Sequence, residues 1–153
     1  MAQTVLVGST GFVGGNLMAA HTFDAAYHST DVAEGFGCRN ELVVYAGVPA
    51  AMFLANRDPA ADLAVMAAAR ENLRRLAPRR LVLISSIAVY RDSRGKDEAS
   101  PMETEGLPPY GANRLQLEQW VREDFPGALI VRLPALYGKG LKKNFLYDLH
   151  TLT

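Results

Sequence analysis

Three glycines spaced three residues apart, Gly8, Gly11 and Gly14, form a turn directly after a short apolar run at residues 4–7. Glycine at these positions permits a tight turn, close approach of the backbone to a ligand, and close packing of a helix on a sheet. A helix that begins in such a turn directs its free amide groups at a bound phosphate. The segment therefore predicts a strand, a phosphate-binding turn and a helix, and a purely structural glycine turn is the alternative. The other turn residues expected to contact the phosphates are Thr10, Phe12 and Val13.

The rest of the chain alternates short strand-like runs with helical stretches. Continuously apolar runs, typical of strands buried on both faces of a parallel sheet, occur at residues 4–7, 42–46, 81–84 and 129–131, with a weaker candidate at residues 25–30. The expected helices are Phe12–Ala20, Pro59–Leu76 and residues 110–123. This alternation predicts a three-layer α/β fold of the Rossmann type with a doubly wound parallel sheet.

Local signals bound some of these elements. The second helix should begin at Asp58-Pro59, an N-cap followed by proline, and end before Pro78. The third helix should bury Leu115, Leu117 and Val121 and expose Arg114, Glu118 and Arg122. The polar stretch before it, up to residue 109, predicts a long surface loop beginning at residue 91.

Composition excludes several classes of protein. The 153 residues fit one domain. The 16 basic and 16 acidic residues balance, which removes the electrostatic reason to expect a nucleic acid or a membrane surface as partner. Cys38 stands alone, and His21, His28 and His150 lack metal-ligand spacing, so we expect neither a disulfide nor a metal site. The N-terminus has no basic region of a secretory signal, so we expect a cytoplasmic protein.

Two further segments carry residues that suit acid–base chemistry. Ser86 follows the strand at residues 81–84, and Tyr110 and Arg114 lie four residues apart, on one face of the third helix. A nearby cation stabilises a tyrosinate, and a phenolate can take a proton from a substrate hydroxyl while hydride leaves the carbon. Taken singly, Tyr110 also fits a packed aromatic and Ser86 a strand-end cap.

Asp31 is the candidate for choosing between dinucleotides. It follows Gly14 by 17 residues, near the end of the second expected strand. A carboxylate there can accept hydrogen bonds from the adenosine ribose and would repel a 2′-phosphate. We therefore expect NAD as the cofactor, without excluding NADP, and a solvated loop aspartate is the alternative.

Taken in order, these segments resemble the extended short-chain dehydrogenase/reductase family of NAD(P)-dependent epimerases and dehydratases. The resemblance covers residues 5–14, 44–47, 84–90, 109–118 and 132–138. It places the family's serine or threonine on Ser86 and the acid/base tyrosine of its Y-x-x-x-K motif on Tyr110. The cofactor-binding residues that it implies beyond the glycine turn and Asp31 are Ala46, Gly47, Val48, Ser85, Tyr110, Arg114, Leu133 and Pro134.

The chain departs from the family's pattern in three ways. Arg114 replaces the lysine, and its forked head can displace the nicotinamide ribose or pair with a carboxylate such as Glu118. Ten residues separate Asp31 from the run at residue 42, which predicts a narrower sheet. The family continues into a substrate-binding lobe, so residues 134–153 of this dinucleotide-binding domain correspond to the start of that lobe. Apolar residues there that need a covering partner are Phe145, Leu146, Tyr147, Leu149 and Leu152.

The resemblance implies an NAD(P)-dependent oxidoreductase or epimerase that acts on a secondary alcohol or ketone. The substrate would be a small molecule, such as a nucleotide-activated sugar, and the protein could be a homodimer. A catalytically weak regulatory or interaction domain that binds the same cofactor is the alternative, because Arg114 stands where a working enzyme carries lysine. Met52, Phe53 and Leu54 could flank the substrate mouth but are expected to pack in the interior.

Overall fold

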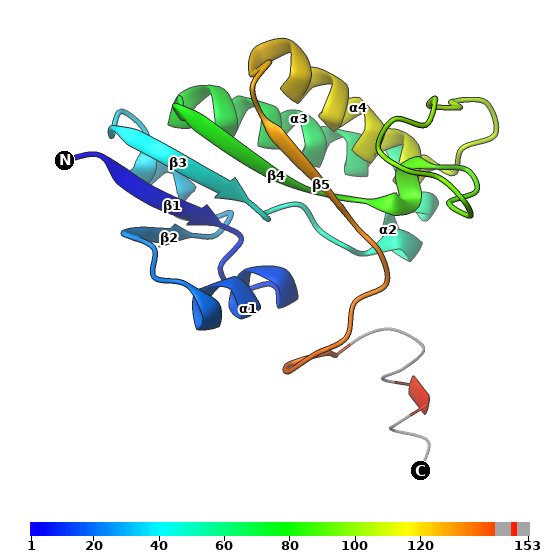
Figure 1. Ribbon diagram of the computed structural model, residues 1–153, viewed down its shortest axis with the longest axis horizontal. Coiled ribbons are helices and arrows are strands. Elements are labelled where there is room, and N and C mark those ends of the chain that lie inside the picture. Colours follow the sequence, from blue (N-terminus) through cyan, green and yellow to red (C-terminus); the bar gives the residue numbers. More distant parts are fainter. Residues whose placement is uncertain (143–147, 150–153) are drawn as a thin grey trace.

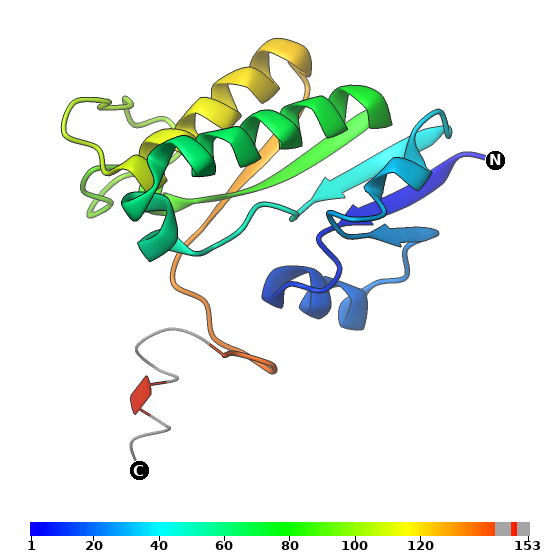
Figure 2. The same cartoon turned by 180° about the vertical axis from the view of Figure 1, so that it is seen from behind.

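Five parallel strands form one sheet in the order β2-β1-β3-β4-β5. They are β1 (Gln3–Val7), β2 (Ala25–Tyr27), β3 (Asn40–Tyr45), β4 (Arg80–Ser86) and β5 (Leu129–Leu133). This computed structural model describes residues 1–142 and 148–149. Helices α3 (Pro59–Leu76) and α4 (Pro109–Asp124) cover one face of the sheet (Figures 1 and 2). Strand β2 lies on one side of β1, and β3 lies on the other. Because crossovers between parallel strands are right-handed, α1 (Phe12–Ala20), which connects β1 to β2, lies on the opposite face of the sheet. The predicted doubly wound α/β fold is confirmed.

The sheet is narrow on the β2 side. Strand β3 pairs directly with β1, and the only regular element between β2 and β3 is the short 3₁₀ helix η1 (Val32–Gly35). The described residues therefore add no strand outside β2, as the short spacing after Asp31 predicted.

All three predicted helices are confirmed, and capping signals explain the ends of α3. The Asp58 carboxylate accepts a hydrogen bond from the Ala61 amide at 3.1 Å, which caps α3. Helix α3 ends where Ala77 adopts a left-handed conformation, with φ of 45°, before Pro78. Helix α2 (Met52–Arg57) and the 3₁₀ helix η2 (Ile87–Val89) were not predicted.

Strand β2 is shorter than predicted and ends at Tyr27 rather than at residue 30. The Asp31 carboxylate accepts a hydrogen bond from the His28 amide at 2.7 Å, which turns the chain away from the sheet. This side-chain-to-backbone bond competes with the strand pairing.

The main core lies between the sheet and helices α3 and α4. Val43 and Leu83 project from the sheet onto Met66 and Leu73 of α3, and all four are at most 1% exposed. Burying each such side chain contributes about 1.5–3 kcal/mol. These contacts fix α3 against the sheet and so fix the ends of the strands that surround the candidate site.

Helix α4 differs from the prediction in its charged residues. Leu115, Leu117 and Val121 are buried as expected, but so are Arg114, at 4% exposed, and Glu118, at 0%. The expectation that both would face solvent is wrong because each has a partner of opposite charge from another element: Asp62 for Arg114 and Arg132 for Glu118. Arg122 is exposed, as predicted.

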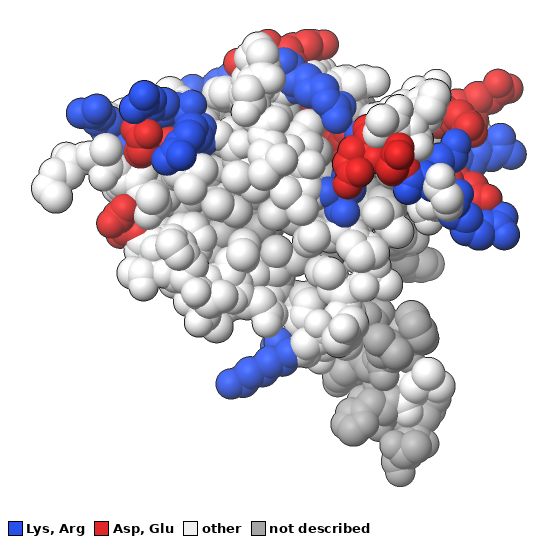
Figure 3. All heavy atoms as spheres, viewed as in Figure 1, with Lys and Arg blue, Asp and Glu red and all other residues white. Residues whose placement is uncertain are grey.

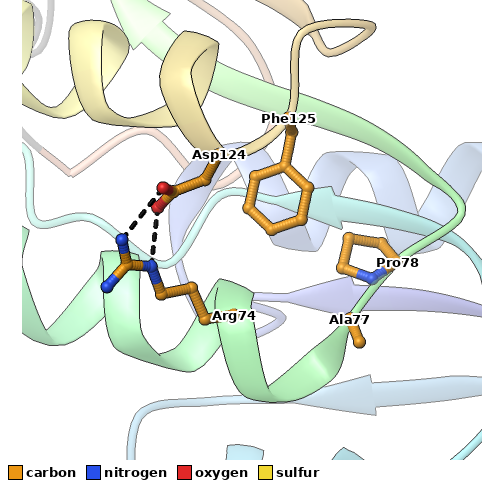
Figure 4. Close-up of a pocket in the computed structure, with 5 residues that line it drawn as sticks. All are labelled: Arg74, Ala77, Pro78, Asp124 and Phe125. Carbon is orange, nitrogen blue, oxygen red and sulfur yellow. Dashed lines mark hydrogen bonds and ion pairs between the residues drawn. The ribbon is translucent and has the colours of Figure 1, made fainter.

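Two arginines of α3, Arg70 and Arg74, bind the last residue of α4, and Figure 4 shows the bonds from Arg74. Asp124 accepts hydrogen bonds from Arg70 Nε at 2.7 Å and from Arg74 Nε at 2.8 Å, and these bonds hold the pKa of its carboxyl below the ordinary value. Arg74 and Asp124 also line a shallow cavity of about 380 Å³ with Ala77, Pro78 and Phe125. This cavity lies where α3 and α4 end, at the amino end of β4.

We expect Asp124→Asn to lower the free energy of unfolding by about 1–2 kcal/mol at pH 7, because two charge-assisted hydrogen bonds are weakened. The native carboxyl has a lowered pKa, so its contribution is complete above the ordinary pKa near 3.8 and is lost as pH falls below that value. Urea unfolding of both proteins between pH 3 and pH 8 checks this. A stability difference that grew as the pH fell would contradict it.

The sheet face opposite α3 and α4 carries few charges over its middle, which Figure 3 shows between charged rims. Its side chains alternate with those of the core, so Leu42, Val44, Val82 and Ile84 lie on it, and all four are half-buried.

Candidate functional site

The glycine turn lies between β1 and α1 and packs against the segment that follows β3. Gly8 has φ of +94°, and a Cβ added there would lie 2.4 Å from the Ala46 carbonyl oxygen. A Cβ on Gly14 would lie 2.0 Å from the Gly8 oxygen. Both positions therefore require glycine for the fold itself.

Gly11 differs from the other two glycines. It has an ordinary φ of −75°, and a Cβ there would meet only the Gly8 oxygen, at a van der Waals distance of 3.5 Å. Gly11 and the adjacent Thr10 are exposed, at the N-terminus of α1, while Phe12 and Val13 are half-buried. The backbone at Gly11 is thus open to a ligand, and this is the cradle that a dinucleotide phosphate would fit.

The residues after β3 complete this side of the site. The Ala46 amide donates to the Val7 carbonyl at 2.8 Å, and a Cβ on Gly47 would lie 3.1 Å from Val7 Cγ1. Val48 packs against the core. The structure therefore brings Ala46 and Gly47 to the glycine turn, and their contact with a cofactor stays a prediction.

The segment after β5 returns to α1. Leu133 pairs in register with Ser86, and Pro134 follows it. The Asn16 side-chain Nδ2 then donates to the Lys139 carbonyl at 3.3 Å. Leu133 and Pro134 thus lie at the carboxyl edge of the sheet, beside the end of β4. Of the apolar residues expected to need a partner, Leu149 is exposed, whereas Phe145, Leu146, Tyr147 and Leu152 lie outside the described residues.

The two serines at the end of β4 have different roles. Ser86 Oγ accepts a hydrogen bond from the Ala88 amide at 3.1 Å and caps η2. Ser85 Oγ donates to Glu118 of α4 at 2.7 Å. Because neighbouring side chains of a strand point to opposite faces, Ser86 points away from α4. The Ser85 hydroxyl is therefore committed to the interior.

Tyr110 lies at the start of α4, next to η2. A Cβ on Gly111 would lie 2.0 Å from the Ala88 carbonyl oxygen, so α4 and η2 are in direct backbone contact. The Tyr110 amide donates to the Asn56 side chain at 2.9 Å. Tyr110 is 8% exposed, and its hydroxyl makes no hydrogen bond among the described residues. The structure therefore places Tyr110 and Ser86 at the same carboxyl end of β4.

Arg114 binds to groups other than those expected. It forms a short ion pair with Asp62 of α3, and its Nη2 donates to the Pro49 carbonyl at 2.6 Å. Its guanidinium lies 4.0 Å from the centre of the Tyr110 ring, and its buried Nε has no partner among the described residues. Pairing with a carboxylate was one predicted outcome, but Glu118 was the wrong candidate.

Glu118 instead binds Arg132 of β5. Arg132 Nε and Nη2 donate to its two oxygens at 3.0 and 2.7 Å, and these bonds raise the pKa of Arg132 above its ordinary value. Asp31 has a partner three residues away in the sequence, since His28 Nε2 lies 3.1 Å from the Asp31 carboxylate. Asp31 is four residues beyond the end of β2, farther from the sheet than the sequence suggested.

Sequence reasoning missed Asn56 and Asp62, which lie on α2 and α3 beside Tyr110 and Arg114. Asp62 accepts from Asn113 Nδ2 at 2.8 Å as well as from Arg114. No local pattern identified either residue, because their partners lie more than 50 positions away in the sequence. Asp62 also lines a cavity of about 370 Å³ between α2 and α3.

Helix α2 presents apolar side chains to the surface. Met52, Phe53 and Leu54 are 52%, 74% and 59% exposed, so the expectation that they pack in the interior is wrong. Six residues allow fewer than two turns, too few for an amphipathic pattern to be recognised.

The described residues contain no group of three or more potential metal ligands. Among the same residues, no helix is both long and apolar enough to span a membrane.

Comparison with known proteins gives one family. A profile of the RmlD substrate-binding domain matches residues 2–153. No curated protein sequence matches the chain. Among solved structures, dTDP-4-dehydrorhamnose reductase from Bacillus anthracis in complex with NADP aligns with a TM-score of 0.80 and 21% identity, over 99% of this chain and 60% of that one.

Two other structures extend the comparison. RMD from Pseudomonas aeruginosa complexed with NADPH gives a TM-score of 0.65 and 28% identity, over 92% of this chain and 56% of that one. UDP-glucuronic acid 4-epimerase from Bacillus cereus in complex with NAD gives a TM-score of 0.66 and 17% identity, over 88% of this chain and 57% of that one. This chain thus spans less than two thirds of each. The likeness to the reductase and the epimerase is a likeness of fold. Because the profile covers nearly every residue, the chain belongs to the RmlD substrate-binding domain family.

Proposed function

We propose that this chain is the dinucleotide-binding part of an NAD(P)-dependent oxidoreductase or epimerase that acts on a nucleotide-activated sugar. The observation that carries the proposal is the open backbone at Gly11, at the same carboxyl edge of the sheet as Ser86 and Tyr110. Ligands of open α/β sheets bind at this edge. The relatives whose names contain dTDP- or UDP-sugars support the substrate class.

In this proposal the chain's own residues bind the cofactor and transfer a proton. The amides of residues 11–14 hold the pyrophosphate, and the segment after β3 lines the nicotinamide side. Tyr110 takes a proton from the substrate hydroxyl, and Ser86 donates a hydrogen bond to the same oxygen. The bound dinucleotide supplies the hydride acceptor. The free Tyr110 hydroxyl supports this assignment, because no hydrogen bond within the described residues has to break first.

Arg114 supports a second candidate function. Its ion pair with Asp62 offsets the positive charge that would otherwise favour a tyrosinate. A protein with this arrangement would bind a dinucleotide but turn it over slowly or not at all, as a regulatory or interaction domain does. The two candidates share the glycine turn and differ in turnover.

We also propose NAD as the preferred cofactor. Residues 28–34 contain no lysine or arginine to bind a 2′-phosphate, and the Asp31 carboxylate binds the amide of His28, the residue that follows β2. A carboxylate beside a phosphate costs binding energy through like-charge repulsion. The relatives solved with NADP and with NAD leave both dinucleotides compatible with the fold.

Side-by-side fluorescence titration of the protein with NADH and NADPH tests both the proposed function and the cofactor preference. We expect NADH to bind about tenfold more tightly, a difference typical of one unfavourable charge contact. Asp31→Ser should narrow the difference by removing the repulsion. Tighter binding of NADPH would reverse the assignment of Asp31, and absence of binding by both would contradict the proposed function.

A further inference from the structure

Glu118 is a fully buried charge at the centre of α4. Its side chain is 0% exposed, and its oxygens accept hydrogen bonds from Arg132 Nε and Nη2 and from Ser85 Oγ. Arg122 approaches from the exposed side, at 3.4 Å. A buried carboxylate must be paired to avoid a large desolvation cost. Arg132, 8% exposed, is thus fixed in one orientation by the fork of two bonds.

The remaining nitrogen of Arg132 links this pair to a loop. Arg132 Nη1 donates to the Tyr90 hydroxyl, and its guanidinium lies 5.0 Å from the centre of the Tyr90 ring. The Tyr90 hydroxyl in turn donates to the Asp97 carbonyl at 2.6 Å. Glu118, Arg132 and Tyr90 therefore form a continuous chain of hydrogen bonds from the interior to the loop, called here the Arg132 tie.

The loop held by this tie connects the two halves of the proposed catalytic pair. Residues 91–108 begin after η2, which Ser86 caps, and end at α4, which begins one residue before Tyr110. The loop extends beyond the sheet beside the start of α4 (Figure 1). Most of its residues are exposed, so little apolar packing holds it. The bond from Tyr90 to Asp97 spans seven positions and fixes the first half of the loop.

We propose that Arg132 is a positioning residue, which acts through Tyr90 to hold residues 91–108 as a wall on the substrate side of the Ser86–Tyr110 site. The effect on substrate rests on the proposed function, whereas the effect on the loop does not. Arginine is required because its planar fork binds Glu118 with two nitrogens and Tyr90 with the third. Lysine, with a single ammonium, can keep the Glu118 charge paired but cannot make all three contacts.

Amide hydrogen exchange of the whole protein tests the tie. Within the loop, the Lys96 amide donates to Ser93 and the Ser100 amide to Asp97. We expect Tyr90→Phe and Arg132→Lys to speed exchange at these amides about tenfold, the equivalent of one hydrogen bond to a charged group. Exchange in β1 and β3 should not change. Arg122→Ala is the matched control, because it removes a Glu118 contact that does not lead to Tyr90. Unchanged loop exchange in Tyr90→Phe would overturn the inference.

Kinetics separate positioning from a purely structural role. With NADH and dTDP-4-dehydrorhamnose, Tyr90→Phe should raise KM for the sugar nucleotide about tenfold, with kcat and NADH affinity within about twofold of wild type. Faster amide exchange in the loop together with an unchanged KM would overturn the positioning role. Absence of turnover in wild type would count against the proposed function alone, and the exchange measurement would then decide the inference.

Discussion

Gly11→Val abolishes dinucleotide binding and leaves the fold intact: this is the result we expect from the open geometry at Gly11. A Cβ at this position meets only the Gly8 oxygen at 3.5 Å, and φ is −75°, so the chain accepts a side chain without strain. The isopropyl group would occupy the space through which a pyrophosphate approaches the α1 amides. We expect affinity for NADH and NADPH to fall at least about 100-fold by calorimetry, as several phosphate hydrogen bonds are lost together.

Two neighbouring glycines supply the controls. A Cβ on Gly15 meets nothing within 4 Å, so Gly15→Ala should bind as wild type does and gain about 0.5–1 kcal/mol of stability. A Cβ on Gly14 would lie 2.0 Å from the Gly8 oxygen, so Gly14→Ala should unfold at a lower temperature whether or not ligand is present. Wild-type affinity in Gly11→Val would contradict the proposed position of the phosphates.

Tyr110→Phe should reduce turnover about 10²–10⁴-fold, the usual contribution of a general acid or base. The hydroxyl makes no hydrogen bond among the described residues, so its removal should leave the melting temperature and the NADH affinity near wild-type values. The measurement is kcat for oxidation of NADH or NADPH with dTDP-4-dehydrorhamnose. Full turnover in Tyr110→Phe would exclude the tyrosine mechanism and favour the regulatory function.

Arg114→Lys extends this test. In the native protein Asp62 and the Pro49 carbonyl bind the guanidinium, so little of its charge acts on Tyr110 and wild-type turnover should be slow. A lysine ammonium is smaller and cannot bind both partners at once, so it is freer to approach the phenol and the ribose. We expect Arg114→Lys to raise kcat and the double variant with Tyr110→Phe to remove the gain. A loss of activity in Arg114→Lys would show that the native pair supports catalysis.

Local sequence signals correctly predicted the helix and the turn whose ends depend on residues adjacent in the chain. Helix α3 matched its prediction because Asp58 and Pro59 cap its start and Pro78 prevents its continuation. The glycine turn was placed correctly because Gly8 and Gly14 meet a backbone requirement that no other residue meets. Strand β2 was predicted too long because Asp31 captures the His28 amide, a contact that the strand-like composition does not show.

The errors at the site arise from contacts between distant positions. Arg114 and Glu118 share a helix and were both expected in solvent, but Asp62 lies 52 positions before Arg114 and Arg132 lies 14 after Glu118. Each buried charge depends on a partner that only the fold brings near. The residues that carry the resemblance were therefore predictable, whereas the partners that modify their chemistry were not.

The Arg132 tie turns the guanidinium of β5 toward the interior, so no charged side chain of β5 remains on its outer side. Strand β5 is one edge of the described sheet, and its sequence Leu-Ile-Val-Arg-Leu contains a single charged residue, which is turned inward to Glu118. Natural proteins protect exposed edges with charged side chains or with very short strands. The opposite edge, β2, has only three residues and is protected by its length. The β5 edge has neither protection, so of the two edges of the described sheet it is the one more open to pairing with another strand.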